Sequence, residues 1–302
     1  MTDFVRIVEV SPRDGLQNEP TKVPTSTKIE LISRLADAGV GTIEATAFVS
    51  PKWVPQMADH KEVMLALPKT ESTKFPVLVP NLEGFEAAVN SGAEEVAVFA
   101  AASESFSRKN INCSISESIN RFVPIMDAAA QYGVRVRGYV SCVVACPYDG
   151  FVAAEKVATV ARELFDLGCY EISLGDTIGV GTPASVSQML QAVAKKVPIE
   201  RLAGHYHDTY GMGVANVFAS WKFGVRTFDS SIAGLGGCPY AKGASGNVAT
   251  EDLIYLLHSL GASTGINLDR LVDCSIWIAS LLGREPRSSV ARALIAKRGT
   301  AI

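Results

Sequence analysis

Hydrophobic residues along the chain follow two alternating spacings, which predict alternating strands and helices. Short runs rich in β-branched and apolar residues, typical of strands, recur at regular intervals. They span 5–10, 42–48, 76–79, 95–100, 134–141, 171–174, 202–207 and 227–232. Apolar residues recur at helical spacing over 26–38, 82–90, 116–132, 154–167, 183–197, 214–223 and 250–260. Glycine follows most of these helical segments, as it commonly does where helices end.

Strands that alternate with helices predict parallel βαβ units. Eight such units in about 250 residues fit a (β/α)8 TIM barrel, an α/β fold. We expect one domain over 1–302, with the barrel over roughly 4–265, an extra C-terminal helix over 269–282, and a poorly ordered tail from Arg284. An open doubly wound sheet is the structural alternative, but Pro12-Arg13-Asp14-Gly15 follows the first strand where a Gly-x-Gly-x-x-Gly turn would stand.

Composition narrows the class of protein. The chain has 302 residues, of which 48% are hydrophobic, and its 28 basic and 31 acidic side chains give a net charge of −3. This balance argues against nucleic-acid binding, and no apolar stretch approaches the roughly 20 residues of a membrane span. A strand-like run begins at Phe4, so we expect no targeting peptide and a cytoplasmic location. Six scattered cysteines make a disulfide framework improbable.

Two histidines mark the candidate chemistry. His205 and His207 end the seventh predicted strand, and side chains two residues apart on a strand point the same way. Active sites of such barrels lie at the C-terminal ends of the strands, where Asp14 and Asn247 also fall. Together these residues form a mixed nitrogen and oxygen set that suits Mg²⁺, Mn²⁺, Co²⁺ or Zn²⁺.

Each of these residues also has a simpler interpretation. Asp14 could be a turn aspartate and Asn247 a helix cap. Two further candidates, Arg13 beside Asp14 and Cys238 in the glycine-rich loop after the eighth strand, could be a solvated cation and an inert thiol. The predicted convergence of Asp14, His205, His207 and Asn247 at one rim favours a site over four coincidences. Glu44 and Asp176 are expected to face the barrel interior, and a buried carboxylate needs a partner such as Arg13 or a metal-bound water.

Longer motifs carry a resemblance to a known family. The stretches 7–19, 48–57, 110–114, 172–179 and 234–240 resemble the 3-hydroxy-3-methylglutaryl-CoA lyases. The resemblance extends from Val5 to about Leu282, and one departure is Ala47, where some relatives carry serine. The pairing of Arg-Asp after strand one with His-x-His on strand seven is shared more widely, by metal-dependent Claisen-type lyases and synthases on this barrel.

The resemblance implies cleavage of (S)-3-hydroxy-3-methylglutaryl-CoA to acetoacetate and acetyl-CoA, a step of leucine breakdown and ketone-body formation. It implies Mg²⁺ or Mn²⁺ held by Asp14, His205, His207 and Asn247, with Arg13, Asp14, His205 and Cys238 as catalytic residues. Supporting or substrate-binding residues would be Gln17, Glu44, Arg137, Ser173, Asp176 and Thr177. We also expect an acyl-CoA substrate and a homodimer.

Other functions stay open at this point. A lyase for a longer homologue, such as 3-hydroxy-3-isohexenylglutaryl-CoA, would carry the same residues. A condensing acyl-CoA synthase of the same superfamily usually has extra C-terminal regions. A Schiff-base aldolase would need a lysine on a strand, and the strand-like runs contain none. A non-catalytic scaffold is disfavoured because the candidate ligands and Cys238 are all present.

Overall fold

The computed structural model describes residues 3–68, 70–237 and 246–299, and within them parallel strands form a closed barrel. The barrel strands are β1 Arg6–Glu9, β2 Thr42–Ile43, β3 Thr46–Ala47, β4 Val77–Leu78, β5 Glu95–Ala101, β6 Arg135–Ser141, β9 Ile172–Asp176, β10 Leu202–Tyr206 and β11 Thr227–Ser230. Their order is β2-β1-β11-β10-β9-β6-β5-β4-β3. A small antiparallel pair, β7 Ala145–Cys146 and β8 Gly150–Phe151, lies outside it.

The two outer strands of this sheet, β2 and β3, follow each other directly along the chain and together form one strand of the barrel. Between β2 and β3, the Glu44 N–H donates to the Glu9 carbonyl (2.9 Å) and the Ala45 N–H donates to the Pro76 carbonyl (3.0 Å). The chain is therefore bonded to both edges at once, which closes the sheet into the predicted (β/α)8 barrel. The expected run 42–48 is split because the chain there changes its bonding partner from β1 to β4.

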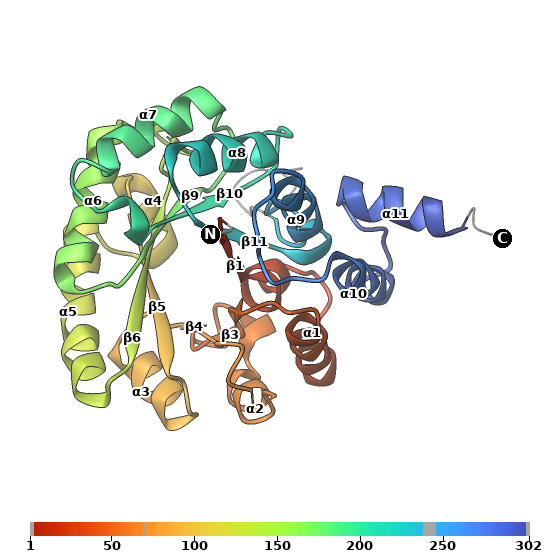
Figure 1. Ribbon diagram of the computed structural model, residues 1–302. Coiled ribbons are helices and arrows are strands. Elements are labelled where there is room, and N and C mark those ends of the chain that lie inside the picture. The colour runs from red at the N-terminus through yellow and green to blue at the C-terminus, as the bar shows by residue number, and fades with distance from the viewer. Residues whose placement is uncertain (1–2, 69, 238–245, 300–302) are drawn as a thin grey trace.

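Helices surround the strands on the outside, with α10 and α11 beside α9 (Figure 1). They are α1 Thr25–Asp37, α2 His60–Leu65, α3 Leu82–Asn90, α4 Glu104–Ile111, α5 Ile115–Tyr132, α6 Ala154–Leu167, α7 Pro183–Val193, α8 Gly213–Phe223, α9 Thr250–Ser259, α10 Leu268–Leu281 and α11 Ser289–Gly299. Short helical turns are η1 Ser11–Gly15, η2 Pro55–Met57, η3 Ile199–Arg201 and η4 Ile232–Gly234. None of the described helices is long and apolar enough to cross a membrane.

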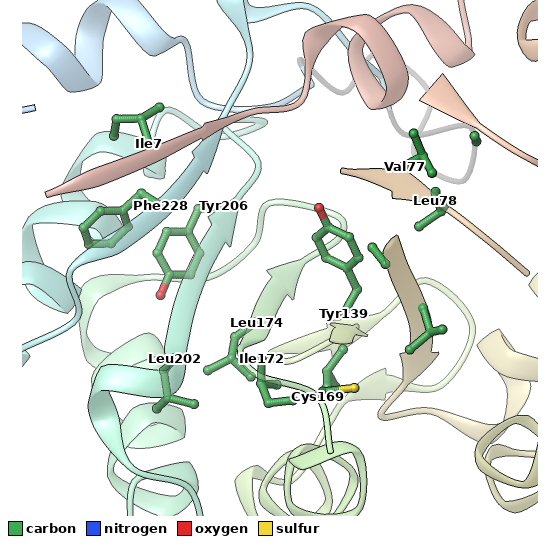
Figure 2. Close-up of a cluster of buried hydrophobic side chains, with 14 of the residues drawn as sticks. Ile7, Val77, Leu78, Tyr139, Cys169, Ile172, Leu174, Leu202, Tyr206 and Phe228 are labelled. Carbon is green, nitrogen blue, oxygen red and sulfur yellow. The ribbon is translucent and has the colours of Figure 1, made fainter. Parts of the chain in front are cut away.

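The barrel has an apolar outer layer and a charged interior. Ile7, Tyr206 and Phe228 belong to one cluster of buried side chains on adjacent strands (Figure 2), and full burial of such a side chain stabilises the fold by about 1.5–3 kcal/mol. Inside the barrel, Arg137 on β6 pairs with Asp229 on β11. Since β9 and β10 lie between those strands in the sheet, this ion pair crosses the interior.

The C-terminal segment corrects one expectation. The tail from Arg284 is not poorly ordered over its described part, because α11 packs on the barrel. Asp252 accepts hydrogen bonds from the Ser288 hydroxyl and the Val290 N–H, each 2.8 Å long, and Arg284 pairs with Glu19. The polar tail is thus anchored by specific partners elsewhere in the fold, namely Asp252 and Glu19.

Candidate active site

Three candidate ligands that are distant in sequence meet at the C-terminal rim of the barrel. Asp14 lies in η1 directly after β1, while His205 lies near the end of β10 and His207 just beyond it. One ligand atom from each of the three lies within 4.8 Å of the others. The fourth predicted ligand is adjacent, since the Asn247 amide donates to Asp14 Oδ2 at 2.7 Å.

The donor set fits a divalent metal. His207 Nδ1 and Asn247 Oδ1 are buried, and within the described residues neither has a hydrogen-bond partner. Buried polar atoms normally have one, so both atoms are suited to a ligand from outside the chain. Imidazole nitrogens combined with carboxylate and amide oxygens bind divalent metals. Asp14, His205 and His207 therefore form a candidate divalent-metal site.

The charge states of Asp14 and His207 match that role. Burial alone would raise the pKa of Asp14, but Arg13, His205 and His207 lower it to about 2. Burial and the neighbouring His205 lower the pKa of His207 to about 4. At neutral pH the carboxylate is therefore ionised and His207 is neutral, which are the forms that bind metals.

Arg13 is fixed beside this cluster by two carboxylates. Its Nε donates to Glu44 Oε2 and its Nη1 donates to Asp14 Oδ1, both at 2.7 Å. Burial would lower the pKa of Arg13, but Glu44 and Asp14 together raise it above its ordinary value. Buried Glu44 has thus found the partner that the sequence suggested, and the site holds a permanent cation in a defined orientation.

A cavity of about 860 Å³ opens onto the cluster. Arg13, Asp14, His205 and His207 line it, and so do Gln17 and Thr177. The apolar part of its wall comprises Val49, Trp53, Val54, Leu78, Pro80, Phe99, Phe106, Ile111, Phe122 and Val140. Lys109 and Arg121 also line the cavity. These two cations can pair with anionic groups of a molecule bound beside the cluster.

The other predicted site residues lie beneath the cavity or outside the described chain. Asp176 is fully buried, its Oδ2 accepts the Gly181 N–H at 2.7 Å, and burial raises its pKa to about 6. Ser173 donates to Asp229, and Arg137 is enclosed by Asp229, Glu171 and Tyr139. The described residues that line the cavity do not include Arg137, and Cys238 lies outside the described residues.

Sequence reasoning missed two residues next to the site. Asp229 accepts from Arg137 and Ser173 and lies against His205, while the Tyr139 hydroxyl donates to Glu44 Oε1 at 3.3 Å. A signal for Asp229 existed, because it is an acidic residue inside a strand-like apolar run, as Glu44 is. Tyr139 lies two residues after Arg137 on β6 and so shares its face.

Comparison with known proteins gives the family. The HMGL-like family model matches residues 4–278. The chain is 57% identical to hydroxymethylglutaryl-CoA lyase, mitochondrial, of Gallus gallus over 96% of this chain and 97% of that protein. It is also 57% identical to the 3-hydroxy-3-isohexenylglutaryl-CoA/hydroxy-methylglutaryl-CoA lyase of Pseudomonas aeruginosa, over 97% of this chain and 98% of that protein.

Solved structures agree with this result. A crystal structure of hydroxymethylglutaryl-CoA lyase from Pseudomonas aeruginosa superposes with a TM-score of 0.96 at 56% identity, covering 98% of this chain and 99% of that one. An HMG-CoA lyase from Acinetobacter baumannii, in complex with coenzyme A and 3-methylmalate, superposes with a TM-score of 0.92 at 37% identity, covering 96% and 95%. The family model and these near full-length likenesses show that the chain belongs to the HMGL-like family.

Proposed function

We propose that this chain is a hydroxymethylglutaryl-CoA lyase, which cleaves (S)-3-hydroxy-3-methylglutaryl-CoA to acetoacetate and acetyl-CoA. The observation that carries the proposal is the Asp14–His205–His207 cluster, which lies beside the cation of Arg13 and lines a cavity of about 860 Å³. The full-length similarity to enzymes of that name supports the same reaction.

The reaction asks two things of the site. A base must take the proton of the 3-hydroxyl group, so that the C2–C3 bond breaks and its electron pair passes to the departing acetyl thioester as an enolate. The enolate carbon C2 must then receive a proton. A divalent metal held by Asp14, His205, His207 and Asn247 would lower the pKa of a bound hydroxyl group, as it does for bound water.

Asp14 is the candidate for the base, because it lines the cavity and contributes to the cluster, and His205 would act through it. Asp14 is ionised at neutral pH and therefore able to accept a hydrogen bond from the substrate hydroxyl. Gln17 and Thr177 line the same cavity, where they would contact the substrate.

Arg13 would neutralise the enolate oxygen as negative charge develops on the thioester. Its orientation is set before substrate binds, because Glu44 and Asp14 hold two edges of the guanidinium. Charge placed in advance in a site with little water is commonly worth about 10²–10³ in rate. Cys238 would protonate the enolate carbon, a role proposed from its motif. Glu44, Ser173 and Asp176 would hold these groups in place without touching the substrate. Arg137 does not line the cavity either, which favours the same role for it.

The metal that we propose is Mg²⁺ or Mn²⁺, because two of the four side-chain ligands offer oxygen and the remaining positions would take water or substrate oxygens. The dimeric state and the cytoplasmic location stay predictions. Light scattering of the purified protein tests the first, and fractionation of the source cells tests the second.

The first experiment measures acetyl-CoA release from 3-hydroxy-3-methylglutaryl-CoA by metal-stripped protein, with and without added Mg²⁺ or Mn²⁺. We expect release only with metal, accompanied by an equal amount of acetoacetate. Absence of release with either metal, from protein whose circular dichroism shows it folded, would reject this substrate.

A further inference from the structure

A fully buried carboxylate lies beneath the candidate metal cluster. Asp229, on β11, accepts two hydrogen bonds from the Arg137 guanidinium, from Nη2 to Oδ1 (2.7 Å) and from Nη1 to Oδ2 (3.1 Å). The Ser173 hydroxyl donates to Oδ2 at 2.7 Å. The same Oδ2 lies 3.2 Å from Nδ1 of His205. Asp229 therefore connects the charged interior of the barrel to one of the candidate ligands.

The surroundings of Asp229 keep it ionised. Both of its oxygens accept hydrogen bonds from the Arg137 guanidinium in a buried ion pair, and Oδ2 also accepts from the Ser173 hydroxyl. An ionised carboxylate can only accept hydrogen bonds, so the contact requires a hydrogen on Nδ1 of His205. In a neutral imidazole the lone pair then lies on Nε2.

The network also prevents Asp229 from turning away. Arg137 is held on its other edge by Glu171, whose Oε1 accepts from Nε at 2.8 Å, and its Nη1 donates to the Tyr139 hydroxyl at 2.9 Å. Arg137 and Asp229 are 1% exposed. Because the guanidinium is held on both edges, it orients the two oxygens of Asp229, and Oδ2 faces the Nδ1 edge of His205.

We propose that Asp229 is a positioning residue that selects the Nδ1–H tautomer of His205 and leaves Nε2 available to a divalent metal. Partners of this kind commonly orient metal-binding histidines and change metal affinity about 10–100-fold when they are lost. The inference rests on the proposed function only in taking Asp14, His205 and His207 as the metal site.

The direct test is the tautomer of His205 in metal-free wild-type protein. Nitrogen NMR of protein labelled with ¹⁵N-histidine distinguishes protonated from unprotonated ring nitrogens, and the His205→Gln variant identifies the signals of His205. At alkaline pH, where imidazoles are neutral, we expect a hydrogen on Nδ1 and none on Nε2. A hydrogen on Nε2 would overturn the proposal, and this measurement needs no variant at Asp229 to fold.

A matched pair of variants gives the second test. Asp229→Asn and Glu171→Gln each remove one negative charge from Arg137, but only Asp229 contacts His205. We expect Asp229→Asn to weaken Mn²⁺ binding about 10–100-fold and to shift the hydrogen of His205 to Nε2. Glu171→Gln should leave the tautomer and the Mn²⁺ affinity close to those of wild type.

Equal weakening by both variants, or wild-type protein that does not bind Mn²⁺, would contradict the proposal. Neither measurement uses a thioester. A protein that shows the expected tautomer and Mn²⁺ binding but releases no acetyl-CoA would therefore reject the proposed reaction and leave the role of Asp229 standing.

Discussion

Replacement of Arg13 by glutamine tests the chemistry of the site most directly. Arg13 is only 7% exposed and lines the cavity, and its guanidinium donates to Asp14 and Glu44 with two bonds of 2.7 Å. Glutamine keeps an amide that can donate hydrogen bonds, but it carries no charge. The substitution therefore removes the cation from the position where we expect enolate charge to develop.

Two separate losses should follow. Removal of one preorganised donor from a developing oxyanion costs about 10²–10³ in kcat, or about 2.7–4 kcal/mol of transition-state stabilisation. Glu44, which is fully buried, also loses its charged partner, and breaking a buried pair costs about 3–5 kcal/mol of folding free energy. We expect kcat to fall by at least about 10² with a small change in KM, and the free energy of unfolding to fall as well.

The assay measures acetyl-CoA release at saturating Mg²⁺ or Mn²⁺, with urea unfolding of the same samples. Glu44→Gln is the matched variant, because it keeps the cation but removes the buried carboxylate; it should lower stability with a smaller loss of kcat. Arg162→Gln removes an exposed arginine paired with Asp166 on α6 and should change neither quantity. Folded Arg13→Gln protein whose kcat stays within about threefold of wild type, a difference below 1 kcal/mol, would refute the role of Arg13.

Three further predictions concern the ligands and the C-terminal helix. A Cβ on Gly246 would lie 2.3 Å from the backbone of Gly236, so Gly246→Ala should displace Asn247 and weaken Mn²⁺ binding. Gly237→Ala is the control and should leave the Mn²⁺ affinity unchanged, because a Cβ there meets nothing within 4 Å. Equal Mn²⁺ affinities of the two variants would contradict the prediction. The folded-state pKa of Asp14, about 2, lies below its ordinary value of 3.8. In metal-free protein, Asp14 should therefore contribute up to about 2 kcal/mol to the free energy of unfolding above pH 3.8, and this contribution should be lost as pH falls toward 2. Urea unfolding of Asp14→Asn should lack this loss, and a pH dependence equal to that of wild type would contradict the prediction. Ser288→Ala removes a side-chain cap at the Ala291 N–H and a hydrogen bond to Asp252. Hydrogen exchange over 289–299 should therefore become faster, by an amount that corresponds to about 1 kcal/mol of lost protection, whereas Ser289→Ala, at an exposed position, should have little effect. Equal exchange rates in both variants would show that α11 is anchored otherwise.

Local patterns in the sequence determined most elements of the barrel. The helices over 82–90 and 154–167 have the predicted bounds, because an apolar stripe and a clear end signal lie within the segment itself. The helix α4 was missed, since its residues Glu104–Ile111 are mostly polar and its start depends on the Ser103 cap. The tail was misjudged for a similar reason, because Asp252, which anchors α11, lies far from it in sequence.

The candidate site divides in the same way. The sequence determined that His205 and His207 point together, because strand geometry makes side chains two residues apart share a face. It also indicated that Glu44 needs a partner, because a buried carboxylate is costly alone. Only the tertiary structure decided that Asp229 would bind Arg137 and reach His205. That contact joins β6, β10 and β11 across the barrel, and it exists because the sheet closes, a property of all the strands together that no local pattern contains.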